Sequence, residues 1–308
     1  MDFEGLLRAL VDTDCDVMAD EPLSAHTTFR IGGRAALYVL PRTTTALVAA
    51  VRLLVRCGVR YRVFGALSNV LCSDAGFCGV ILSTRNLTAA RVEGHQIIAD
   101  CGAPMARLAA LAASAGLAGL AELSGIPGTL GGAVCMNAGA FGRELCDVFT
   151  SCEVYNPAKD QTETRTADAL AFAYRHTNLG SAGEILLCAT LTLKPDNVMA
   201  IANTMREVRE RRLASQPHGA SAGSIFRRPA PHLSAGALIA DAGLAGLTMG
   251  RAQISTKHAG FIVNLGGASA ADVLALIRET RTRVFAATGY TLTCEVEYLR
   301  ADDTACTS

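Results

Sequence analysis

The stretch GIPGTLGGAVCMNAGAFG, residues 125–142, holds six glycines and one proline in eighteen positions and carries no charged side chain. Glycine has no Cβ atom, so its backbone can approach a neighbour closely and can adopt positive φ angles. Close packing of a helix on a sheet explains one or two such glycines but not six. We therefore expect a loop here whose peptide groups lie against a ligand.

A membrane span is the alternative explanation, because residues 123–142 are uncharged and a bilayer crossing needs about 20 apolar residues. The composition argues against it. Each glycine costs a helix interior about 1 kcal/mol relative to alanine, and Pro127 costs about 3 kcal/mol. The sequence therefore predicts a loop and no membrane-spanning segment.

Length and charge narrow the class of protein. The 308 residues exceed one ordinary domain, so we expect two or three structural units. Basic and acidic residues both number 28, and no dense basic run appears, which excludes the usual electrostatic footprint of a nucleic-acid partner. Residues 1–18 are acidic and lack the features of a secretory signal, so we expect a cytoplasmic protein.

Eleven cysteines are scattered along the chain, with no CxxC pair and no zinc-like spacing to histidine. In a reducing compartment such thiols behave as small buried hydrophobic groups. The sequence therefore predicts no bound metal.

The hydrophobic periodicity predicts a mixture of strands and helices, beginning with a small βαβ unit. In the first 116 residues we expect strands at 35–41, 59–65, 79–84 and 91–102, and helices at 44–58 and 103–116. We then expect a hairpin at 151–166, a strand at 184–195 and a connecting helix at 196–217. The last third should contain strands at 221–226, 260–266 and 290–299, and helices at 233–246 and 271–289. This pattern is typical of the α+β class.

A second glycine-bearing loop, FGALSNVLCSDAGFCG at residues 64–79, also follows a predicted strand. Neither loop matches GxGxxG or GxxxxGK[ST], so no Rossmann or P-loop chemistry is indicated. Ser124 and the glycine amides could still surround a pyrophosphate. Two such loops suit an extended nucleotide cofactor, although ordinary turns explain their spacing equally well.

Eight blocks, spread over nearly the whole chain, resemble in order and approximate spacing the UDP-N-acetylenolpyruvoylglucosamine reductases, the FAD enzymes of peptidoglycan precursor synthesis. The blocks are HTTFRIGGRA (26–35), VFGALSNVLCSDAGFCGVIL (63–82), GIPGTLGGAVCMNAGAFG (125–142), FAYRHT (172–177), SAGSIFRRP (221–229), AGALIADAGLAG (235–246), HAGFIVN (258–264) and TLTCEVEYL (291–299). A single block would be weak, but eight in order are specific to the family.

The resemblance implies an FAD-binding unit of the PCMH type, similar to vanillyl-alcohol oxidase, over about residues 30–195. We place its first, βαβ-like subdomain at residues 1–85 and its second at 86–196, followed by an α+β substrate-binding domain at 197–308. We expect a monomer. By resemblance, the FAD contacts come from Gly65, Ser68, Asn69, Ser124, Gly125, Ile126, Gly128, Thr129 and Gly132.

The resemblance also implies the reaction. NADPH reduces the flavin, and the enolpyruvyl ether of UDP-N-acetylglucosamine then accepts a hydride to give UDP-N-acetylmuramate, a step in building the cell wall on which cell shape and division depend. Hydride addition leaves carbanion-like density, which must be stabilised as an enolate and then protonated. In this family Ser224 would be the proton donor, Glu295 would help to stabilise the enolate, and Arg175 would bind the carboxylate.

Tyr174 and Arg228 are further expected to contact the substrate. Taken alone, each residue of this set has an ordinary explanation as a surface, turn or strand residue. Glu297 is the rival of Glu295 on the same strand face, and we choose Glu295 because the family glutamate precedes a valine.

The chain also departs from the family. Ala66 and Leu67 stand where glycines are usual, and a positive φ at Leu67 would cost about 1–2 kcal/mol. Arg227 and Arg228 replace a lysine and an asparagine. The short interval of 48 residues, 176 to 223, between Arg175 and Ser224 resembles the shorter, type II branch.

Two other functions stay open on the sequence alone. One is an FAD-dependent oxidase or dehydrogenase acting on another sugar or alcohol. The other is a diverged, non-catalytic nucleotide-sugar binding protein that has lost its flavin through the change at residues 66–67. The intact serine, arginine and glutamate set favours the reductase.

Overall fold

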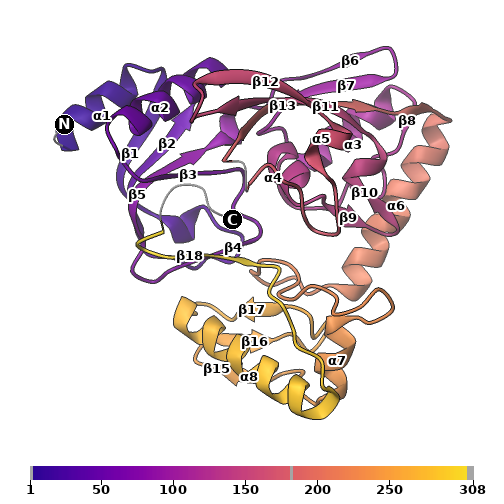
Figure 1. Cartoon of the computed structure of the whole chain (residues 1–308). Helices are drawn as coiled ribbons and strands as arrows, with labels where there is room; N and C mark the ends of the chain where they lie inside the picture. Colours follow the sequence, from indigo (N-terminus) through magenta and orange to yellow (C-terminus); the bar gives the residue numbers. More distant parts are fainter. Residues whose placement is uncertain (1–2, 181–182, 304–308) are drawn as a thin grey trace.

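The computed structural model describes residues 3–180 and 183–303. Two sheets with their helices form the larger part of the molecule, and a small α+β unit lies below them in Figure 1. The long helix α6 (Val198–Ser215) descends from the larger part to the smaller one. Its first turn begins at Asn197, whose side chain accepts hydrogen bonds from the amides of Met199 and Ala200.

The first sheet contains four strands. Their spatial order is β1 (Cys15–Pro22), β2 (Arg34–Pro41), β5 (Phe77–Ser83) and β3 (Tyr61–Phe64). Strands β2, β5 and β3 run parallel, and β1 runs antiparallel to β2. The predicted βαβ unit is present with helix α2 (Thr44–Arg56), but β5 lies between its two strands. Helix α1 (Phe3–Val11) and strand β1 were not anticipated from the sequence.

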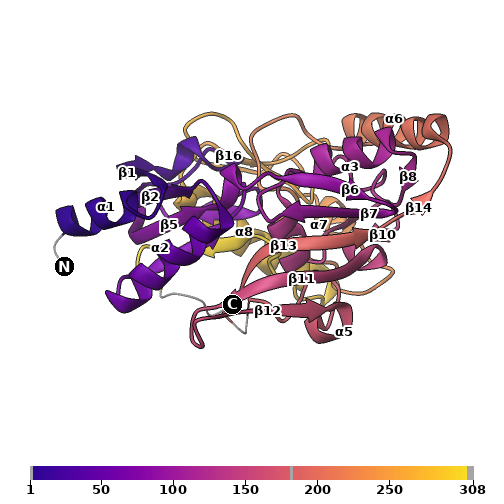
Figure 2. The same ribbon diagram turned by 90° about the horizontal axis from the view of Figure 1, so that it is seen from above.

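The second sheet is antiparallel throughout. Its order is β12 (Gln161–Thr166), β11 (Phe149–Asn156), β13 (Ile185–Thr192), β7 (Gln96–Asp100) and β6 (Ala90–Glu93). The hairpins predicted at residues 91–102 and 151–166 are both present. Figure 2 shows this sheet beside helices α3 (Met105–Ser114) and α6, and the short α5 (Ala167–Leu170) follows β12. Strand β8 (Leu117–Ala118) pairs with β14 (Lys194–Pro195).

The glycine-rich stretch is a loop only in part. Residues 125–129 are irregular, but residues 130–135 form the short helix α4 (Leu130–Cys135), so the single-loop prediction is wrong there. Leu130, Ala133 and Val134 are buried together on one face of α4, and this burial outweighs the two glycines inside the helix. Beyond it, β9 (Gly139–Ala140) pairs with β10 (Arg143–Glu144).

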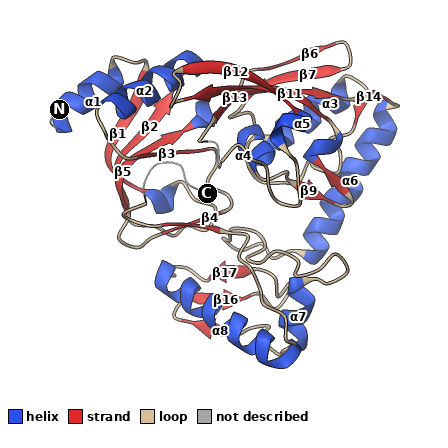
Figure 3. Cartoon of the chain, viewed as in Figure 1, coloured by secondary structure: helices blue, strands red, loops and turns tan. Residues whose placement is uncertain are grey.

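The lower unit packs two helices on a small sheet, as Figure 3 shows by colour. Its strands are β15 (Thr248–Met249), β16 (Ala252–Ile254) and β17 (Ile262–Asn264), and its helices are α7 (Ala235–Asp241) and α8 (Ala270–Thr288). The apolar face predicted for α8 is buried. Short single-turn 3-10 helices occur at Leu23–Ala25, Thr84–Asn86 and Leu145–Asp147.

Two predicted strands of this last third are wrong in extent. Residues 221–226 form isolated bridges rather than a strand, because Ser224 pairs with Phe261 whereas Phe226 pairs with Cys294. A segment that changes partner within two residues cannot build a continuous ladder. Of residues 290–299, only β18 (Glu297–Leu299) is a regular strand.

The lower unit is tied back to the N-terminal part. Strand β18 pairs in parallel with β4 (Val70–Cys72), and Asp74 accepts hydrogen bonds from the amides of Ala270 and Ala271 at 2.7 and 3.0 Å. The side-chain amide of Asn264 donates to the carbonyl oxygen of Phe29 at 3.0 Å. These contacts join the lower unit and β18 to the segments around β4 and Phe29.

Candidate active site

The two glycine-bearing loops meet. The hydroxyl of Ser68 donates to the carbonyl oxygen of Pro127 at 3.0 Å, and a Cβ added to Gly65 would lie 2.1 Å from Oγ1 of Thr129. Gly128 has a φ of +131°, a conformation that side chains rarely tolerate. The structure thus brings Gly65, Ser68, Gly128 and Thr129 into one narrow backbone cradle.

This cradle fits the group that the sequence predicts. The Thr129 hydroxyl is buried but has no hydrogen-bond partner among the described residues. A buried hydroxyl without a partner is costly, so the Thr129 hydroxyl is free to bond a ligand or a water molecule. Bare backbone amides beside a free hydroxyl are donors of the kind that a diphosphate or a flavin ring accepts.

Leu67 adopts a positive φ, the case considered in the sequence analysis. Its φ is +51° and its side chain is only 3% exposed, packed in a cluster with Phe64 and Val70. Burying a leucine contributes about 1.5–3 kcal/mol, which offsets a backbone strain of about 1–2 kcal/mol. The loop therefore keeps its left-handed turn without the glycine that the resemblance led us to expect at this position.

Asn69 lies at the same loop but directs its side chain elsewhere. Its amide nitrogen Nδ2 donates to the carbonyl oxygen of Glu295 at 3.1 Å, and its own carbonyl oxygen accepts from the amide of Glu297 at 3.0 Å. Asn69 thereby couples the first loop to the segment that carries Glu295.

The remaining predicted cofactor residues are spread around the cradle. Ser124 and Gly125 face helix α6, where a Cβ on Gly125 would lie 2.5 Å from Cδ of Arg212. Ile126 packs against the main apolar core. Gly132 is exposed within α4, and a Cβ there would meet nothing within 4 Å.

A second group of polar side chains is built around Arg175. Its Nε donates to Oε1 of Glu295 at 2.9 Å, and its Nη2 donates to the carbonyl oxygen of Gly139 at 3.0 Å. Both side chains of the Arg175–Glu295 pair are only 16% exposed. Arg175 has a φ of +54°, so its backbone is held in a strained conformation. The rival carboxylate, Glu297, pairs with Arg62 instead.

Ser224 lies on the backbone segment next to Glu295. The amide of Glu295 donates to the carbonyl oxygen of Ile225 at 2.7 Å, and the amide of Ile225 donates to the carbonyl oxygen of Gly260 at 2.9 Å. The hydroxyl of Ser224 is partly buried and makes no hydrogen bond to another described residue. The structure therefore brings Ser224, Glu295 and Arg175, which are far apart in the sequence, into one region.

Tyr174 and Arg228 form the exposed edge of this region. The guanidinium carbons of Arg175 and Arg228 lie 5.0 and 5.7 Å from the centre of the Tyr174 ring. The amide of Arg228 also donates to the Tyr174 hydroxyl at 3.4 Å. The Tyr174 ring thus contacts two cations, of which Arg228 is exposed.

The electrostatics of the region centre on Glu295. Burial raises the pKa of its carboxyl above the ordinary value, and the positive charges of Arg175, Arg227 and Arg228 oppose that rise without cancelling it. A carboxyl with a raised pKa holds its proton more tightly than a glutamate in water. A carboxyl with a raised pKa and the cation Arg175 therefore lie together in one partly buried site.

Sequence reasoning missed one residue that joins these parts. The hydroxyl of Thr28 donates to the carbonyl oxygen of Ser221 at 2.8 Å and lies 3.3 Å from that of Ser68. It thereby links the first loop to the segment leading to Ser224. Thr28 stands in the block HTTFRIGGRA, whose two threonines before an apolar residue were the available signal.

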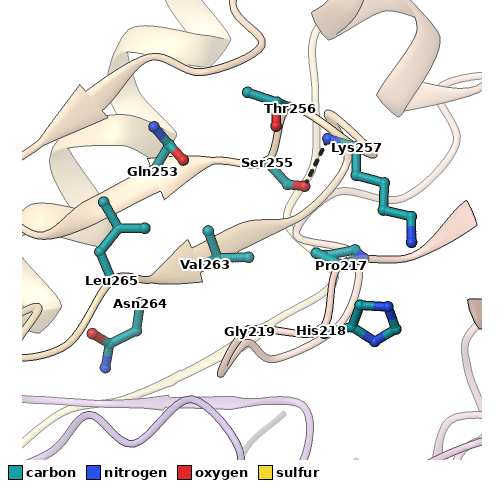
Figure 4. A pocket seen from close by; sticks show the side chains of 10 residues that line it. All are labelled: Pro217, His218, Gly219, Gln253, Ser255, Thr256, Lys257, Val263, Asn264 and Leu265. Atoms are coloured by element: carbon teal, nitrogen blue, oxygen red, sulfur yellow. Dashed lines mark hydrogen bonds between the residues drawn. The ribbon is translucent and has the colours of Figure 1, made fainter.

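A separate cavity of about 280 Å³ lies in the lower unit, where Figure 4 shows its lining. It is lined by Pro217, His218, Gly219, Gln253, Ser255, Thr256, Lys257, Val263, Asn264 and Leu265. The Lys257 ammonium donates to the carbonyl oxygen of Leu213 at 2.6 Å and so closes the end of α6. None of Arg175, Ser224 and Glu295 lines this cavity.

Known proteins resemble the chain over almost all of its length. A protein named UDP-N-acetylenolpyruvoylglucosamine reductase from Caldicellulosiruptor saccharolyticus is 42% identical over 296 residues, covering 95% of this chain and 94% of its own. One of the same name from Pseudothermotoga lettingae is 40% identical over 284 residues, covering 92% and 98%. The chain belongs to the UDP-N-acetylenolpyruvoylglucosamine reductase family.

Domain models and a solved structure agree with this family. The model described as FAD binding domain matches residues 35–164, which contain both loops of the cradle, and the reductase C-terminal domain model matches residues 216–299. The crystal structure of the reductase from Thermus caldophilus is 34% identical, covers 92% of this chain and 98% of its own, and has a TM-score of 0.79. The predicted α+β fold with an FAD-binding unit, the cofactor FAD and the flavin oxidoreductase class are therefore confirmed.

No helix among the described residues is both long enough and apolar enough to cross a membrane. Within residues 3–180 and 183–303, no group of three or more histidine, cysteine, aspartate or glutamate side chains is placed to hold a metal ion.

Proposed function

We propose that this reductase uses NADPH to reduce UDP-N-acetylglucosamine enolpyruvate to UDP-N-acetylmuramate in the cytoplasm, with Arg175, Ser224 and Glu295 as its catalytic residues. Family membership supports the FAD-dependent reduction of the enolpyruvyl ether in peptidoglycan synthesis. The observation that carries the residue assignment is the partly buried Arg175–Glu295 pair, hydrogen-bonded next to the segment of Ser224.

Bound FAD would supply the transfer of hydride between the reductant and the substrate. The residues that would hold it are Gly65, Ser68, Gly128 and Thr129, whose bare backbone and unpaired hydroxyl form the cradle. We place Ser124, Gly125, Ile126 and Gly132 around the same cofactor, and the main chain of Asn69 beside it.

Arg175 binds and orients the substrate carboxylate in this proposal. Its Nε and Nη2 are occupied by Glu295 and by the carbonyl oxygen of Gly139, so the guanidinium is fixed in place before substrate arrives. A fixed cation stabilises negative charge as it develops without a cost of reorganisation. Glu295 shares this site and, with its raised pKa, can hold a proton beside the developing enolate.

Ser224 donates the proton that completes the reduction. A serine hydroxyl is a weak acid, but a carbanion-like carbon is far more basic than water, so the transfer is downhill once the hydroxyl is positioned. Two backbone hydrogen bonds hold this segment on both sides. The amide of Ile225 donates to the carbonyl oxygen of Gly260, and the carbonyl oxygen of Ile225 accepts from the amide of Glu295. The hydroxyl has no competing hydrogen bond to a described residue.

The substrate's diphosphate would lie along the exposed edge formed by Tyr174 and Arg228. Arginine is suited to phosphate because its planar fork can donate two hydrogen bonds at once. We assign residues 1–85 and 86–196 to the two FAD-binding subdomains and residues 197–308 to the substrate domain, and we propose a monomer. By this activity the protein would contribute to cell shape and cell division.

Replacing Ser224 with alanine tests the assignment. The Ser224→Ala variant should still let NADPH bleach the flavin at the normal rate, but turnover with the enolpyruvyl substrate should fall by about 10²–10⁴. The two half-reactions would be followed separately by the flavin absorbance in a stopped-flow instrument.

The matched control is Ser221→Ala, which removes a hydroxyl three residues away in the same segment. It should keep full turnover. Normal turnover by Ser224→Ala would contradict the proposed role of Ser224. A wild-type protein that shows no substrate-dependent NADPH oxidation would contradict the proposed function itself.

A further inference from the structure

The second half of the glycine-rich stretch holds a buried polar side chain that the proposed reaction does not use. Asn137 is only 1% exposed. Its Nδ2 donates to Oε2 of Glu144 at 2.9 Å and to the carbonyl oxygen of Ala173 at 3.1 Å. Its Oδ1 accepts from the amide of Cys146 at 3.1 Å. A buried amide whose two donors and acceptor are all bonded fixes the segments that it joins.

The end of helix α4 explains the backbone of Asn137 but not its side chain. Its φ is +40°, and its amide donates to the carbonyl oxygen of Val134 at 3.1 Å. The amide of Ala138 donates to the carbonyl oxygen of Ala133 at 2.8 Å. These are the two bonds of a Schellman motif, in which a left-handed residue ends a helix. Glycine suits that position best and is frequent in this stretch, so the motif does not account for an asparagine side chain.

Two tight turns meet at Asn137. In the first, strands β9 and β10 pair around residues 141–142, which both have positive φ. In the second, an isolated antiparallel bridge begins at Ala173 and places Arg175 in the turn, with its φ of +54°. Asn137 bonds Glu144 of the first turn and Ala173 of the second. Its side chain therefore sets the position of one turn relative to the other.

The guanidinium of Arg175 reaches from the second turn to the first. Its Nη2 donates to the carbonyl oxygen of Gly139, and its Nη1 lies 4.0 Å from Oε1 of Glu144. A Cβ on Gly139 would lie 3.3 Å from this Nη1 and 2.9 Å from Cγ of Glu144, so glycine lets the two side chains approach. Asn137 holds Oε2, the other oxygen of the same carboxylate. Its hydrogen bond thus keeps Glu144 directed toward Arg175.

We propose that Asn137 is a positioning residue for Arg175 in the reduction of the enolpyruvyl substrate. It holds the hairpin that carries Gly139 and Glu144 against the turn that carries Arg175, so the guanidinium meets the substrate carboxylate in one orientation. A misplacement of about 1 Å at such a group can cost about a hundredfold in rate. The inference rests on the proposed function for what Arg175 binds.

Asn137→Asp tests this role with the smallest change of shape. Aspartate tolerates a left-handed backbone as asparagine does, but its carboxylate cannot donate to Glu144 or Ala173 and repels the carboxylate of Glu144. The matched control is Asn156→Asp. Asn156 is also buried, at 8% exposed, but its Oδ1 accepts from two backbone amides, which a carboxylate oxygen can equally do.

Single-turnover kinetics separate a positioning role from a general loss of structure. In Asn137→Asp, the enolpyruvyl substrate should reoxidise the reduced flavin about tenfold to a hundredfold more slowly. Flavin reduction by NADPH and the affinity for FAD should match wild type, and Asn156→Asp should match it in every measurement. A normal rate of reoxidation, or an equal loss in both half-reactions, would overturn the proposal.

Dependence on Arg175 is tested by combining variants. In an Arg175→Ala background, Asn137→Asp should slow reoxidation by less than about threefold, because the group that it positions is gone. A further loss as large as in the wild-type background would mean that Asn137 acts independently of Arg175, against the proposal.

The Nε–H group of Arg175 gives a readout that does not need turnover. Its signal in a ¹⁵N NMR spectrum would be identified by its absence in Arg175→Ala, and its exchange with water should be about tenfold faster in Asn137→Asp. Unchanged exchange would contradict the positioning role. A wild-type chain that shows this effect of Asn137→Asp but does not reduce the enolpyruvyl substrate would contradict only the proposed function.

If Asn137→Asp does not fold, Asn137→Gly replaces it, because glycine adopts the same φ without strain and adds no charge. The same slower reoxidation and faster exchange are expected, and wild-type values for both would refute the proposal.

Discussion

The pKa of the Glu295 carboxyl is set by two opposing effects of its surroundings. Burial favours its protonated form, and the three neighbouring arginines favour the ionised form, with burial prevailing. Because its pKa is higher in the folded protein than the ordinary 4.5 of an unfolded chain, Glu295 binds its proton more tightly when folded. It therefore stabilises the fold below the unfolded pKa, and this stabilisation is lost as the pH rises through the folded pKa.

This sign predicts the behaviour of a Glu295→Gln variant, which keeps the shape of the side chain but cannot ionise. The free energy of unfolding of wild type, relative to the variant, should fall as the pH rises above the ordinary pKa of 4.5 and level off once Glu295 is ionised in the folded protein. Urea unfolding across that range measures the difference. A relative rise with pH would mean that Arg175 prevails over burial and that the pKa is depressed.

At the scale of single elements, the loop from Gly65 to Asn69 depends on two opposing effects at Leu67. Replacing Leu67 with glycine relieves a strain of about 1–2 kcal/mol but removes a buried side chain and leaves a cavity, at a cost of about 2–5 kcal/mol. Leu67→Gly should therefore lower the free energy of unfolding by about 2 kcal/mol, within a range of about 0–4 kcal/mol, as measured by denaturant titration.

The neighbouring Ala66→Gly variant serves as the control, because it changes the same loop without removing a large buried side chain. It should change the unfolding free energy by no more than about 1 kcal/mol. A Leu67→Gly protein more stable than wild type would show that backbone strain, and not burial, dominates this loop.

Elements defined by local patterns could be predicted from the sequence, and elements defined by distant partners could not. Helix α2 and the two hairpins follow from hydrophobic periodicity, glycine and Asn156-Pro157, which all act over a few residues. The segment around Ser224 failed as a strand because its pairing partners, Phe261 and Cys294, lie in two different segments far along the chain. Helix α4 was missed because burial outweighed the low helix propensity of its glycines.

The candidate site shows the same division. Glycine content alone pointed to the loop that contains Gly128 and Thr129, because bare backbone is visible in the sequence. The pairing of Arg175 with Glu295 joins residues 120 positions apart, and only resemblance to a family could name them. A cavity of about 500 Å³ beside Arg212, between α3 and α6, could not be anticipated, because its walls come from two helices and a loop that meet only in the folded chain.

At the scale of the whole molecule, Asp74 fastens the lower unit to the first sheet. Its carboxylate accepts hydrogen bonds from the first two amides of α8, Ala270 and Ala271, where the helix dipole also favours negative charge. Asp74→Ala should lower the free energy of unfolding by about 0.5–2 kcal/mol and speed proteolytic cleavage between the units.

The control for this variant is Asp241→Ala, which removes an exposed aspartate that makes no side-chain hydrogen bond to a described residue. It should leave both the unfolding midpoint and the cleavage rate close to those of wild type. Equal effects of the two variants would show that the contact of Asp74 with α8 contributes nothing to holding the units together.

The parallel pairing of β18 with β4 also affects the order in which parts of the protein can fold during synthesis. Asn69 and Glu295, joined by a hydrogen bond, are 226 positions apart, and β18 lies two residues beyond Glu295. A ribosome releases the loop with Gly65 long before it has made Glu295, and contacts of such long range form late. The residues of the FAD cradle, Gly65 to Thr129, are therefore synthesised well before the segment with Glu295. During synthesis the cradle is complete in sequence while the catalytic region beside it is still missing.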